Sequence, residues 1–270
     1  MLYNWKVRAL KQPVINYWWR YYLAWRGTRV GNYNDIPECI RRAARDHSFV
    51  DIGCMWGVNG QYAFLAEEAG ATSVTGVDVF GPTPEFEQTR TARGSRVRFV
   101  LGDATAPATL ATIGPHDVVF CAGVLYHHPS PFDLLVALRQ ICRTTLILRT
   151  STIPEVEGLP NAAVFFPQLP APARARWNLS RLGLRNQVGI TGAFQPDEGY
   201  SNWFWGLTPS CLRSMLEVAG FRVDEQWSEA FAQTAICTPV ATAFSHRLPG
   251  EADARAMADA ISAARIARPA

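Results

Sequence analysis

The sequence of 270 residues has few cysteines, and no two of them stand in a CxxC arrangement. A zinc site or a disulfide framework needs cysteines at close, regular spacings, so neither is expected. Several of these cysteines lie inside apolar runs, where a thiol behaves as a small hydrophobic side chain. We therefore expect a reduced, cytoplasmic protein, whose six cysteines are Cys39, Cys54, Cys121, Cys142, Cys211 and Cys237.

A long uninterrupted hydrophobic run is also missing. The first 30 residues are rich in Trp and Tyr, yet Lys and Arg interrupt every apolar stretch well before the roughly 20 residues that a bilayer span requires. The segment also lacks a small-residue cleavage site after an apolar stretch, so neither a transmembrane helix nor a secretory signal is expected. Such a segment would suit a membrane surface or a homodimer contact. We favour a helix packed over the core or over the entrance to a site.

Charge of one sign is not in strong excess either, since the formal net charge is +3 at pH 7. This balance does not favour a polyanionic partner bound across the whole surface, although it allows a local basic patch.

The sequence does contain a regular alternation of short β-branched runs and helical patterns from residue 48 onward. This alternation is typical of βαβ units and a parallel sheet. We predict a doubly wound α/β fold whose seven-stranded sheet is mostly parallel. The predicted strands are 48–53, 72–79, 96–103, 116–123, 144–150, 221–230 and 234–244.

The alternation breaks between residues 151 and 207, where five prolines accompany little periodicity. A segment of this length without clear elements is usually functional, so we predict an insertion for substrate recognition. Thr208 is predicted to cap a helix that begins at Pro209, as Ser130 is for an earlier helix. The predicted divisions are a helical, aromatic and basic N-terminal segment (1–47), a core (48–150), the insertion (151–207), the end of the core (208–246) and a helical tail (247–270).

The stretch "VDIGCMWGVNG" places an acid and two glycines, Asp51, Gly53 and Gly57, at the end of the first predicted strand. The dinucleotide fingerprint GxGxxG needs glycines two and then three residues apart, a spacing that Gly53 and Gly57 do not have. Glycines at such a strand end let a ligand approach the backbone amides closely. The pattern resembles that of class I S-adenosylmethionine (SAM)-dependent methyltransferases, which implies a Rossmann-like fold, methyltransferase activity and SAM as cofactor.

The resemblance continues at the next strand ends and implies further cofactor-binding residues. Asp78 ends the second strand, where the family's acid accepts the ribose hydroxyls. No basic residue stands beside it in the sequence, so a structural role is not expected. Asp103 ends the third strand, beside the place of the adenine amino group. In "DVVFCAGVLYHH", Ala122 and Gly123 would lie beside the methionine part of the cofactor. Asp51 could instead hold the turn through amide protons, and Asp103 could cap a helix.

Methyl transfer to a hydroxyl needs an aligned acceptor and a base that removes its proton. The segment "YHHPSP" after the fourth strand offers Tyr126, His127 and His128. Histidine suits a base because its unperturbed pKa of roughly 6.5 lies near neutrality. We expect one histidine to be the base, with His127 slightly favoured, and the other to pack against or cap the next helix. No compact acid cluster follows this strand, so a metal is not predicted.

The acceptor is expected to bind among aromatic residues outside the recognisable core. Aromatic faces beside polar groups suit a sugar ring, whereas a polyphenol or polyketide would need fewer polar groups. The alanine- and arginine-rich composition is similar to that of actinobacterial proteins, and a resemblance to mycobacterial sugar O-methyltransferases, which modify mannose oligosaccharides, also favours a saccharide. We therefore predict an O-methyltransferase for a small molecule, preferably a saccharide. The expected substrate-binding residues are Gln168, Tyr200, Asn202, Trp203 and Trp205.

Two other functions remain open. "GVLYHHPSP" resembles a segment of the family that carboxymethylates wobble uridine in transfer RNA. That family has a large N-terminal extension and a carboxylated cofactor, whereas 47 residues precede the first strand here and no basic pocket is assigned, so the same activity is not expected. An RNA methyltransferase is nevertheless one alternative, because basic residues surround Trp177. The second alternative is a non-catalytic module of this fold. The basic residues are Arg174, Arg176, Arg181 and Arg185.

Overall fold

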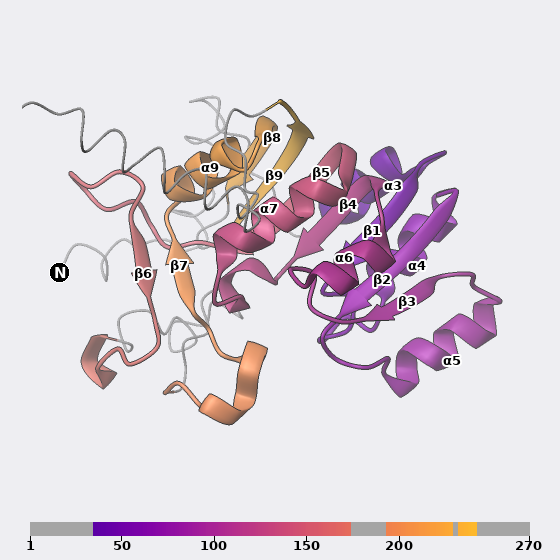
Figure 1. Ribbon diagram of the computed structural model, residues 1–270, viewed down its shortest axis with the longest axis horizontal. Coiled ribbons are helices and arrows are strands. Elements are labelled where there is room, and N and C mark those ends of the chain that lie inside the picture. Colours follow the sequence, from indigo (N-terminus) through magenta and orange to yellow (C-terminus); the bar gives the residue numbers. More distant parts are fainter. Residues whose placement is uncertain (1–34, 174–192, 229–231, 242–270) are drawn as a thin grey trace, which may run out of the picture.

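The computed structural model describes residues 35–173, 193–228 and 232–241, which form a seven-stranded sheet and a separate two-stranded sheet (Figure 1). The order in the large sheet is β3-β2-β1-β4-β5-β9-β8. The first five of these strands pair in parallel, and β9 runs antiparallel to both of its neighbours. The predicted fold class is therefore confirmed. The strands are β1 (Ser48–Ile52), β2 (Ser73–Asp78), β3 (Arg98–Leu101), β4 (His116–Ala122), β5 (Cys142–Ser151), β8 (Phe221–Ser228) and β9 (Ala232–Pro239).

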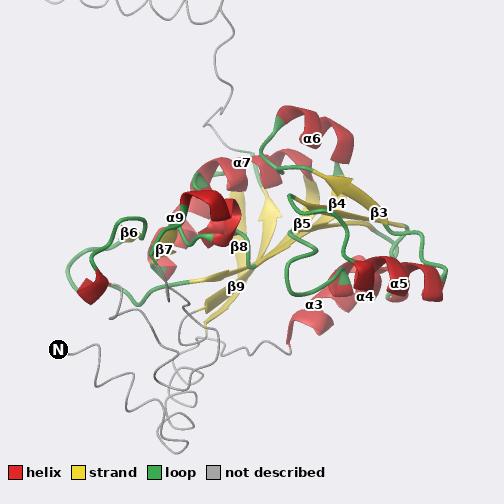
Figure 2. Cartoon of the chain, turned by 90° about the horizontal axis from the view of Figure 1, so that it is seen from below, coloured by secondary structure: helices red, strands yellow, loops and turns green. Residues whose placement is uncertain are grey.

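Helices cover both faces of the sheet, as Figure 2 shows. Side chains that alternate along β1 enter opposite cores, since Phe49 packs on the side of α3 to α5 and Val50 on the side of α7 and α9. This explains why β1 and β4 read as almost continuous apolar runs. One face carries α3 (Asp35–Ala44), α4 (Gln61–Glu68) and α5 (Pro84–Arg93), and the other α6 (Pro107–Ile113), α7 (Pro131–Ile141) and α9 (Pro209–Val218).

The two predicted helix caps have different outcomes. Thr208 caps α9 with its side chain, which accepts the amide of Cys211, and Pro209 is the first helical residue. Ser130 does occupy the N-cap position of α7, but its side chain makes no capping bond. The backbone amide of Ser130 donates instead to His128 Nδ1 at 3.0 Å, so the histidine stabilises the start of this helix.

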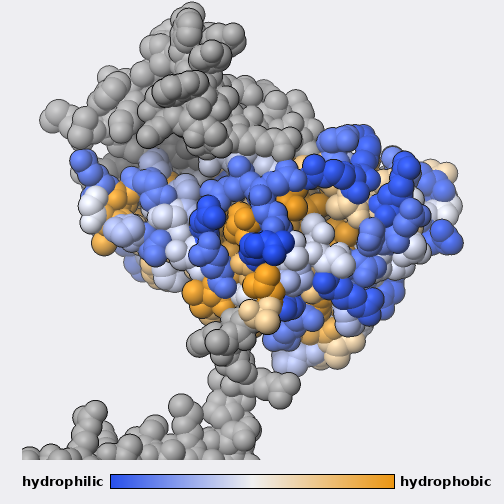
Figure 3. All heavy atoms as spheres, turned by 90° about the horizontal axis from the view of Figure 1, so that it is seen from above, coloured by the Kyte–Doolittle hydropathy of each residue, from blue (hydrophilic) through white to orange (hydrophobic). Residues whose placement is uncertain are grey.

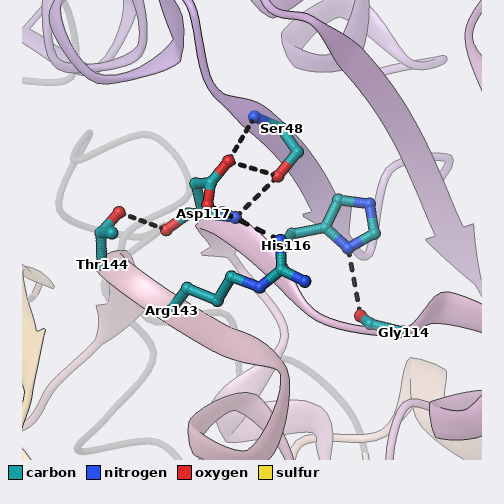
Figure 4. Close-up of polar contacts among 6 residues, drawn as sticks. All are labelled: Ser48, Gly114, His116, Asp117, Arg143 and Thr144. Atoms are coloured by element: carbon teal, nitrogen blue, oxygen red, sulfur yellow. Dashed lines mark hydrogen bonds and ion pairs between the residues drawn. The ribbon is translucent and has the colours of Figure 1, made fainter.

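The amino ends of β1, β4 and β5 are joined by a closed polar network (Figure 4). Asp117 Oδ2 accepts both the amide and the hydroxyl of Ser48, at 2.9 and 2.7 Å, and the Asp117 carbonyl accepts the hydroxyl of Thr144 at 2.7 Å. The neighbouring His116 ring donates from Nδ1 to the carbonyl of Gly114 at 3.1 Å. Polar groups at this end of the sheet are thus bonded to one another.

The insertion contains short elements that the sequence did not predict. Strands β6 (Ala163–Phe165) and β7 (Trp205–Leu207) form the antiparallel two-stranded sheet, which lies beside the large sheet in Figure 1. The 3-10 turns η1 (Leu125–His127) and η3 (Pro196–Ser201) bring the core and the insertion together. Apart from α3, the predicted terminal helices fall outside the described residues.

On the face shown in Figure 3, hydrophobic residues form patches bordered by hydrophilic ones. Among the described residues, no helix is both long and apolar enough to cross a membrane. All six cysteine side chains are buried.

Candidate active site

The carboxyl ends of β1, β2, β4 and β5 border a cavity of about 740 Å³, a size that suits a small molecule or a cofactor. Another part of its wall comes from the η1 turn and from Tyr200, Ser201 and Trp203 of the insertion. Open α/β sheets bind their ligands at this end of the strands. Segments far apart in the sequence therefore build one site.

Gly53 gives the cavity bare main chain where the first strand ends. Its φ of 83° lies in the left-handed region, and its amide donates to the carbonyl of Val77 at 2.8 Å. A Cβ on Gly53 would stand 2.2 Å from Val124 Cγ2, so no side chain fits there. Gly57 also has a positive φ, of 70°, but it does not line the cavity.

Asp51 is an almost fully buried carboxyl on the cavity wall, with 1% of its surface exposed. Its Oδ2 has no hydrogen-bond partner. Burial and the charge of Asp78 raise the pKa of Asp51 to about 8, against the opposing effect of a hydrogen bond from the backbone of Ala63. The carboxyl thus contacts the first turn of α4 and keeps one buried oxygen without a partner at the cavity wall.

Asp78 has a structural role that the sequence argument did not foresee. Its Oδ2 accepts the amide of Met55 at 2.7 Å and its Oδ1 accepts that of Phe80 at 2.9 Å. These bonds tie the loops after β1 and β2 together. The expectation that Asp78 has no structural role is therefore wrong. Its side chain also lines the cavity.

Asp103 joins the core to the insertion. Its Oδ1 accepts the amide and the hydroxyl of Thr105, both at 2.7 Å, and its Oδ2 accepts the hydroxyl of Tyr200. The imidazole of His128, 3.7 Å from Oδ1, and the hydroxyl of Tyr200 hold the pKa of Asp103 well below its usual range, while burial opposes them. Ala106, and not Asp103, occupies the N-cap of α6.

His127 and His128 both line the cavity but have opposite hydrogen bonding. His127 Nδ1 donates to the main-chain carbonyl of Asn202 at 2.8 Å, which leaves the lone pair of the neutral ring on Nε2. His128 Nδ1 accepts an amide, so the proton of its neutral ring sits on Nε2, on the side of Asp103. Burial lowers the pKa of His127 below its ordinary value, and the bond to Asn202 opposes this effect.

Aromatic rings surround His127. The ring of Tyr126 lies 4.2 Å from the His127 ring and 4.2 Å from the Trp203 ring, measured between centroids, and both aromatic residues line the cavity. Tyr200 also lines it and stacks on His128 at 5.5 Å. Flat apolar faces thus stand beside a nitrogen with a lone pair.

Three of the predicted substrate-binding residues lie elsewhere. The Asn202 side chain bonds within its own loop. Trp205 donates from Nε1 to the carbonyl of Pro129 and packs on Phe165. Gln168 is exposed and does not border the cavity. Ala122 and Gly123, predicted at the cofactor, do line it.

Sequence reasoning missed several cavity residues. Trp56 and Phe80 form an aromatic pair, 5.0 Å apart between ring centroids, on the wall near Asp78. Arg149 and Ser151 line the wall at the end of β5, where Arg149 also donates to Thr234 at 3.2 Å. A cation closing the apolar run "LIL" was the available signal for Arg149. It places positive charge in the cavity, which the sequence analysis had not assigned.

Within residues 35–173, 193–228 and 232–241, no group of three or more His, Cys, Asp or Glu side chains could hold a metal ion. The basic residues around Trp177 fall outside the described part of the chain.

Comparisons with known proteins agree with this geometry. Residues 49–145 match a family model described as a methyltransferase domain. The chain is similar to the tRNA U34 carboxymethyltransferase of Shewanella frigidimarina, at 31% identity over 153 residues, which are 53% of this chain and 40% of that protein. The same enzyme of Methylococcus capsulatus is 35% identical over 153 residues, 50% of this chain and 44% of that protein. The chain thus spans less than half the length of these curated relatives.

Solved structures share the fold. The N-terminal domain of EvdMO1 with SAH bound has a TM-score of 0.52 at 19% identity, covering 77% of this chain and 80% of that one. The 1,6-didemethyltoxoflavin-N1-methyltransferase of Burkholderia thailandensis has a TM-score of 0.51 at 14% identity, covering 86% of this chain and 88% of that one. At these identities the likeness concerns the fold.

Proposed function

Through residues 49–145 this chain belongs to the class I SAM-dependent methyltransferases, and on that premise we propose that it methylates a hydroxyl of a small molecule, preferably a saccharide. The observation that carries this proposal is the hydrogen bond from His127 Nδ1 to the Asn202 carbonyl, because it leaves Nε2 as a proton acceptor on a cavity-lining ring.

The residues at the strand ends fit the cofactor. SAM supplies a methyl group on a sulfonium, from which a nucleophile displaces it in line. The unpaired oxygen of Asp51 can accept a donor from SAM, and the bare backbone at Gly53 allows close approach. Asp78 would accept the ribose hydroxyls and Asp103 the adenine amino group, while Ala122 and Gly123 would border the methionine part.

His127 is the proposed general base. A base must lie beside the acceptor hydroxyl with its lone pair free, and a pKa below the ordinary histidine value keeps the ring neutral at pH 7. His128 supports the start of α7 and faces Asp103 with its protonated nitrogen, so it suits the role less well. Tyr126 borders the same space and would help to orient the acceptor.

The aromatic wall supports the proposed acceptor class. Tyr126 and Trp203 offer flat faces that pack against the C–H bonds of a sugar ring. Hydroxyl and imidazole groups stand nearby for its polar edge, at Tyr200, Ser151 and His127. A phenolic acceptor would use the same faces with fewer polar contacts.

An RNA methyltransferase is the second candidate. It is favoured by the curated relatives, whose name specifies tRNA U34, and by Arg149 in the cavity wall. A non-catalytic binding module is the third candidate, which the free Nε2 of His127 disfavours.

The test is an acceptor screen with labelled SAM over oligosaccharides, phenolics and transfer RNA, after calorimetry has measured SAM binding. Label on an oligosaccharide, at a rate that hardly changes with salt, supports the proposal. Label on transfer RNA alone, with a steep decrease as salt rises, supports the second candidate instead. SAM binding without transfer to any acceptor supports the binding module.

A further inference from the structure

The loop of residues 195–204 lies against the η1 turn that carries His127. The amide of Phe204 donates to the carbonyl of Tyr126 at 2.9 Å, and the carbonyl of Asn202 accepts His127 Nδ1 at 2.8 Å. Two main-chain groups of the insertion thus contact consecutive residues of the site. The position of the Asn202 carbonyl decides which nitrogen of His127 carries the proton.

The Asn202 side chain holds this loop in shape. Its Nδ2 donates to the carbonyls of Gln195 and Gly199, at 2.7 and 3.0 Å, and its Oδ1 accepts the amide of Gln195 at 2.9 Å. The residue is buried, with 7% of its surface exposed. Both the oxygen and the nitrogen of the side-chain amide therefore form hydrogen bonds inside the loop, and the side chain is not placed to bind a methyl acceptor.

We propose that Asn202 is a positioning residue for His127. By closing the 195–202 loop on itself, its side chain fixes its own carbonyl opposite Nδ1. That carbonyl keeps the proton on Nδ1 and the lone pair on Nε2, as a general base requires. The catalytic consequence rests on the proposed function, whereas the protonation of the ring does not.

The chemistry of the loop requires an amide at this position. A carboxylate would keep the bond from the Gln195 amide but would turn oxygen toward two carbonyls in place of the Nδ2 donor. Alanine would remove all three side-chain bonds and leave the carbonyls of Gln195 and Gly199 only the amides of Glu198 and Asn202, at 3.1 and 3.2 Å. Gly199, between them, has a φ of 49° and a ψ of −125°, a conformation that favours glycine, so the loop needs side-chain bonds to hold this permissive residue in place.

The first experiment measures the protonation of the His127 ring by nitrogen NMR of histidine-labelled protein, with His127→Ala used to assign the signals. The native ring is expected to carry its proton on Nδ1. Asn202→Ala is expected to populate the form protonated on Nε2. Gln195→Ala is the matched control, because it removes an exposed side chain from the same loop and keeps the backbone groups that Asn202 binds. It should preserve the native form.

An unchanged ring in Asn202→Ala, or a native ring protonated on Nε2, would overturn the proposal. If Asn202→Ala does not fold, Asn202→Asp provides the same comparison, since it loses both Nδ2 bonds and keeps one acceptor oxygen. This measurement needs no methyl acceptor, so it decides the positioning role even if the proposed function fails.

The second experiment is a double-mutant cycle once an acceptor is known. Asn202→Ala is expected to lower kcat about 10- to 100-fold through misplacement of the base, with SAM affinity unchanged. In a His127→Ala background the same substitution should have no further effect on kcat. Equal losses in both backgrounds would mean that Asn202 acts independently of His127.

Discussion

The two ends of β4 carry histidines with the same first hydrogen bond and different second ones. His116, at the amino end, donates from Nδ1 to the Gly114 carbonyl, and its Nε2 lies 3.2 Å from the hydroxyl of Thr75. His127, just beyond the carboxyl end, donates from Nδ1 to the Asn202 carbonyl, and its Nε2 has no partner among the described residues. Burial lowers the pKa of both rings. The unused nitrogen, rather than the pKa, therefore distinguishes the proposed catalytic ring from the structural one.

Two aspartates repeat this contrast. Hydrogen bonds from the hydroxyl and amide of Ser48 lower the pKa of Asp117, whereas burial and the charge of Asp78 raise that of Asp51 to about 8. The network in Figure 4 uses the Asp117 carboxylate to join strands. The cavity leaves an oxygen of Asp51 unpaired, which is costly without a ligand. Groups that lack partners gather at the end where a ligand is expected.

The sharpest test of this contrast exchanges the two histidines for alanine. His127→Ala is expected to lower kcat about 10²- to 10⁴-fold, the usual contribution of a general base, and to cost about 1 kcal/mol of stability because the Asn202 carbonyl loses its donor. His116→Ala is expected to retain activity and to lose a similar stability, about 1 kcal/mol, because the Gly114 carbonyl loses its donor and the Thr75 hydroxyl keeps only the longer bond from Arg98. Steady-state rates and thermal melts check both. Full activity in His127→Ala would place the base elsewhere.

Asp78 tests whether a carboxylate can serve both the fold and a ligand. Asp78→Ala is expected to weaken SAM binding at least about tenfold, since hydrogen bonds to a charged group are lost. Calorimetry measures this affinity. Asp78→Asn is the control, because it keeps one acceptor oxygen for the Met55 amide and should retain more of the stability. Unchanged affinity in Asp78→Ala would remove this residue from the cofactor site.

Asp51 should make stability depend on pH in a direction that Asp117 opposes. The folded-state pKa of Asp51, about 8, exceeds the ordinary value of 3.8, so the folded protein binds more protons than the unfolded chain between these values. The free energy of unfolding should then decrease as pH rises across this range. Asp51→Asn is expected to remove this part of the decrease, as urea unfolding at about pH 5 and about pH 8 would show. The same slope in the variant would contradict the assignment.

The smallest expected effect concerns the pH profile of the reaction. His127 must be neutral to accept a proton, and its pKa lies below the ordinary value. Activity should therefore fall only as pH drops through this lowered pKa, below about 6.5. Asp117→Asn, at the other end of the sheet, should leave the profile in place. A half-maximal rate above the ordinary histidine pKa would indicate a different base.

The fold class could be predicted because the alternation of apolar strand runs and helical patterns is visible in the sequence. β1 and β4 lie between two helical layers, so their apolar runs were visible in the sequence. The contacts within the insertion had no such signal. Nothing periodic shows that the Asn202 amide turns back on its own loop, or that Trp205 bonds to Pro129. The same limit explains why β6 and β7, each three residues long, were missed.

Spacing in the sequence located the acids proposed to bind the cofactor, but it did not reveal their hydrogen-bond partners. Asp78 follows a strand in the expected place, but its bonds to the amides of Met55 and Phe80 depend on how two loops meet. Asp103 was expected beside a ligand, and its contact with Tyr200 links it to residues distant in the chain. Spacing located the strand ends, and tertiary structure determined what each end contacts.

Val124 packs so closely on Gly53 that the chain has no room for a side chain at position 53. The methyl group of Val124 occupies the space that a side chain at position 53 would need, and the positive φ of Gly53 adds strain for any other residue. A smaller residue at position 124 would make room for a side chain but would not relieve this backbone strain, so glycine is best retained at position 53 in any library that varies the cavity wall. Libraries that vary position 53 are expected to yield mostly poorly folded clones.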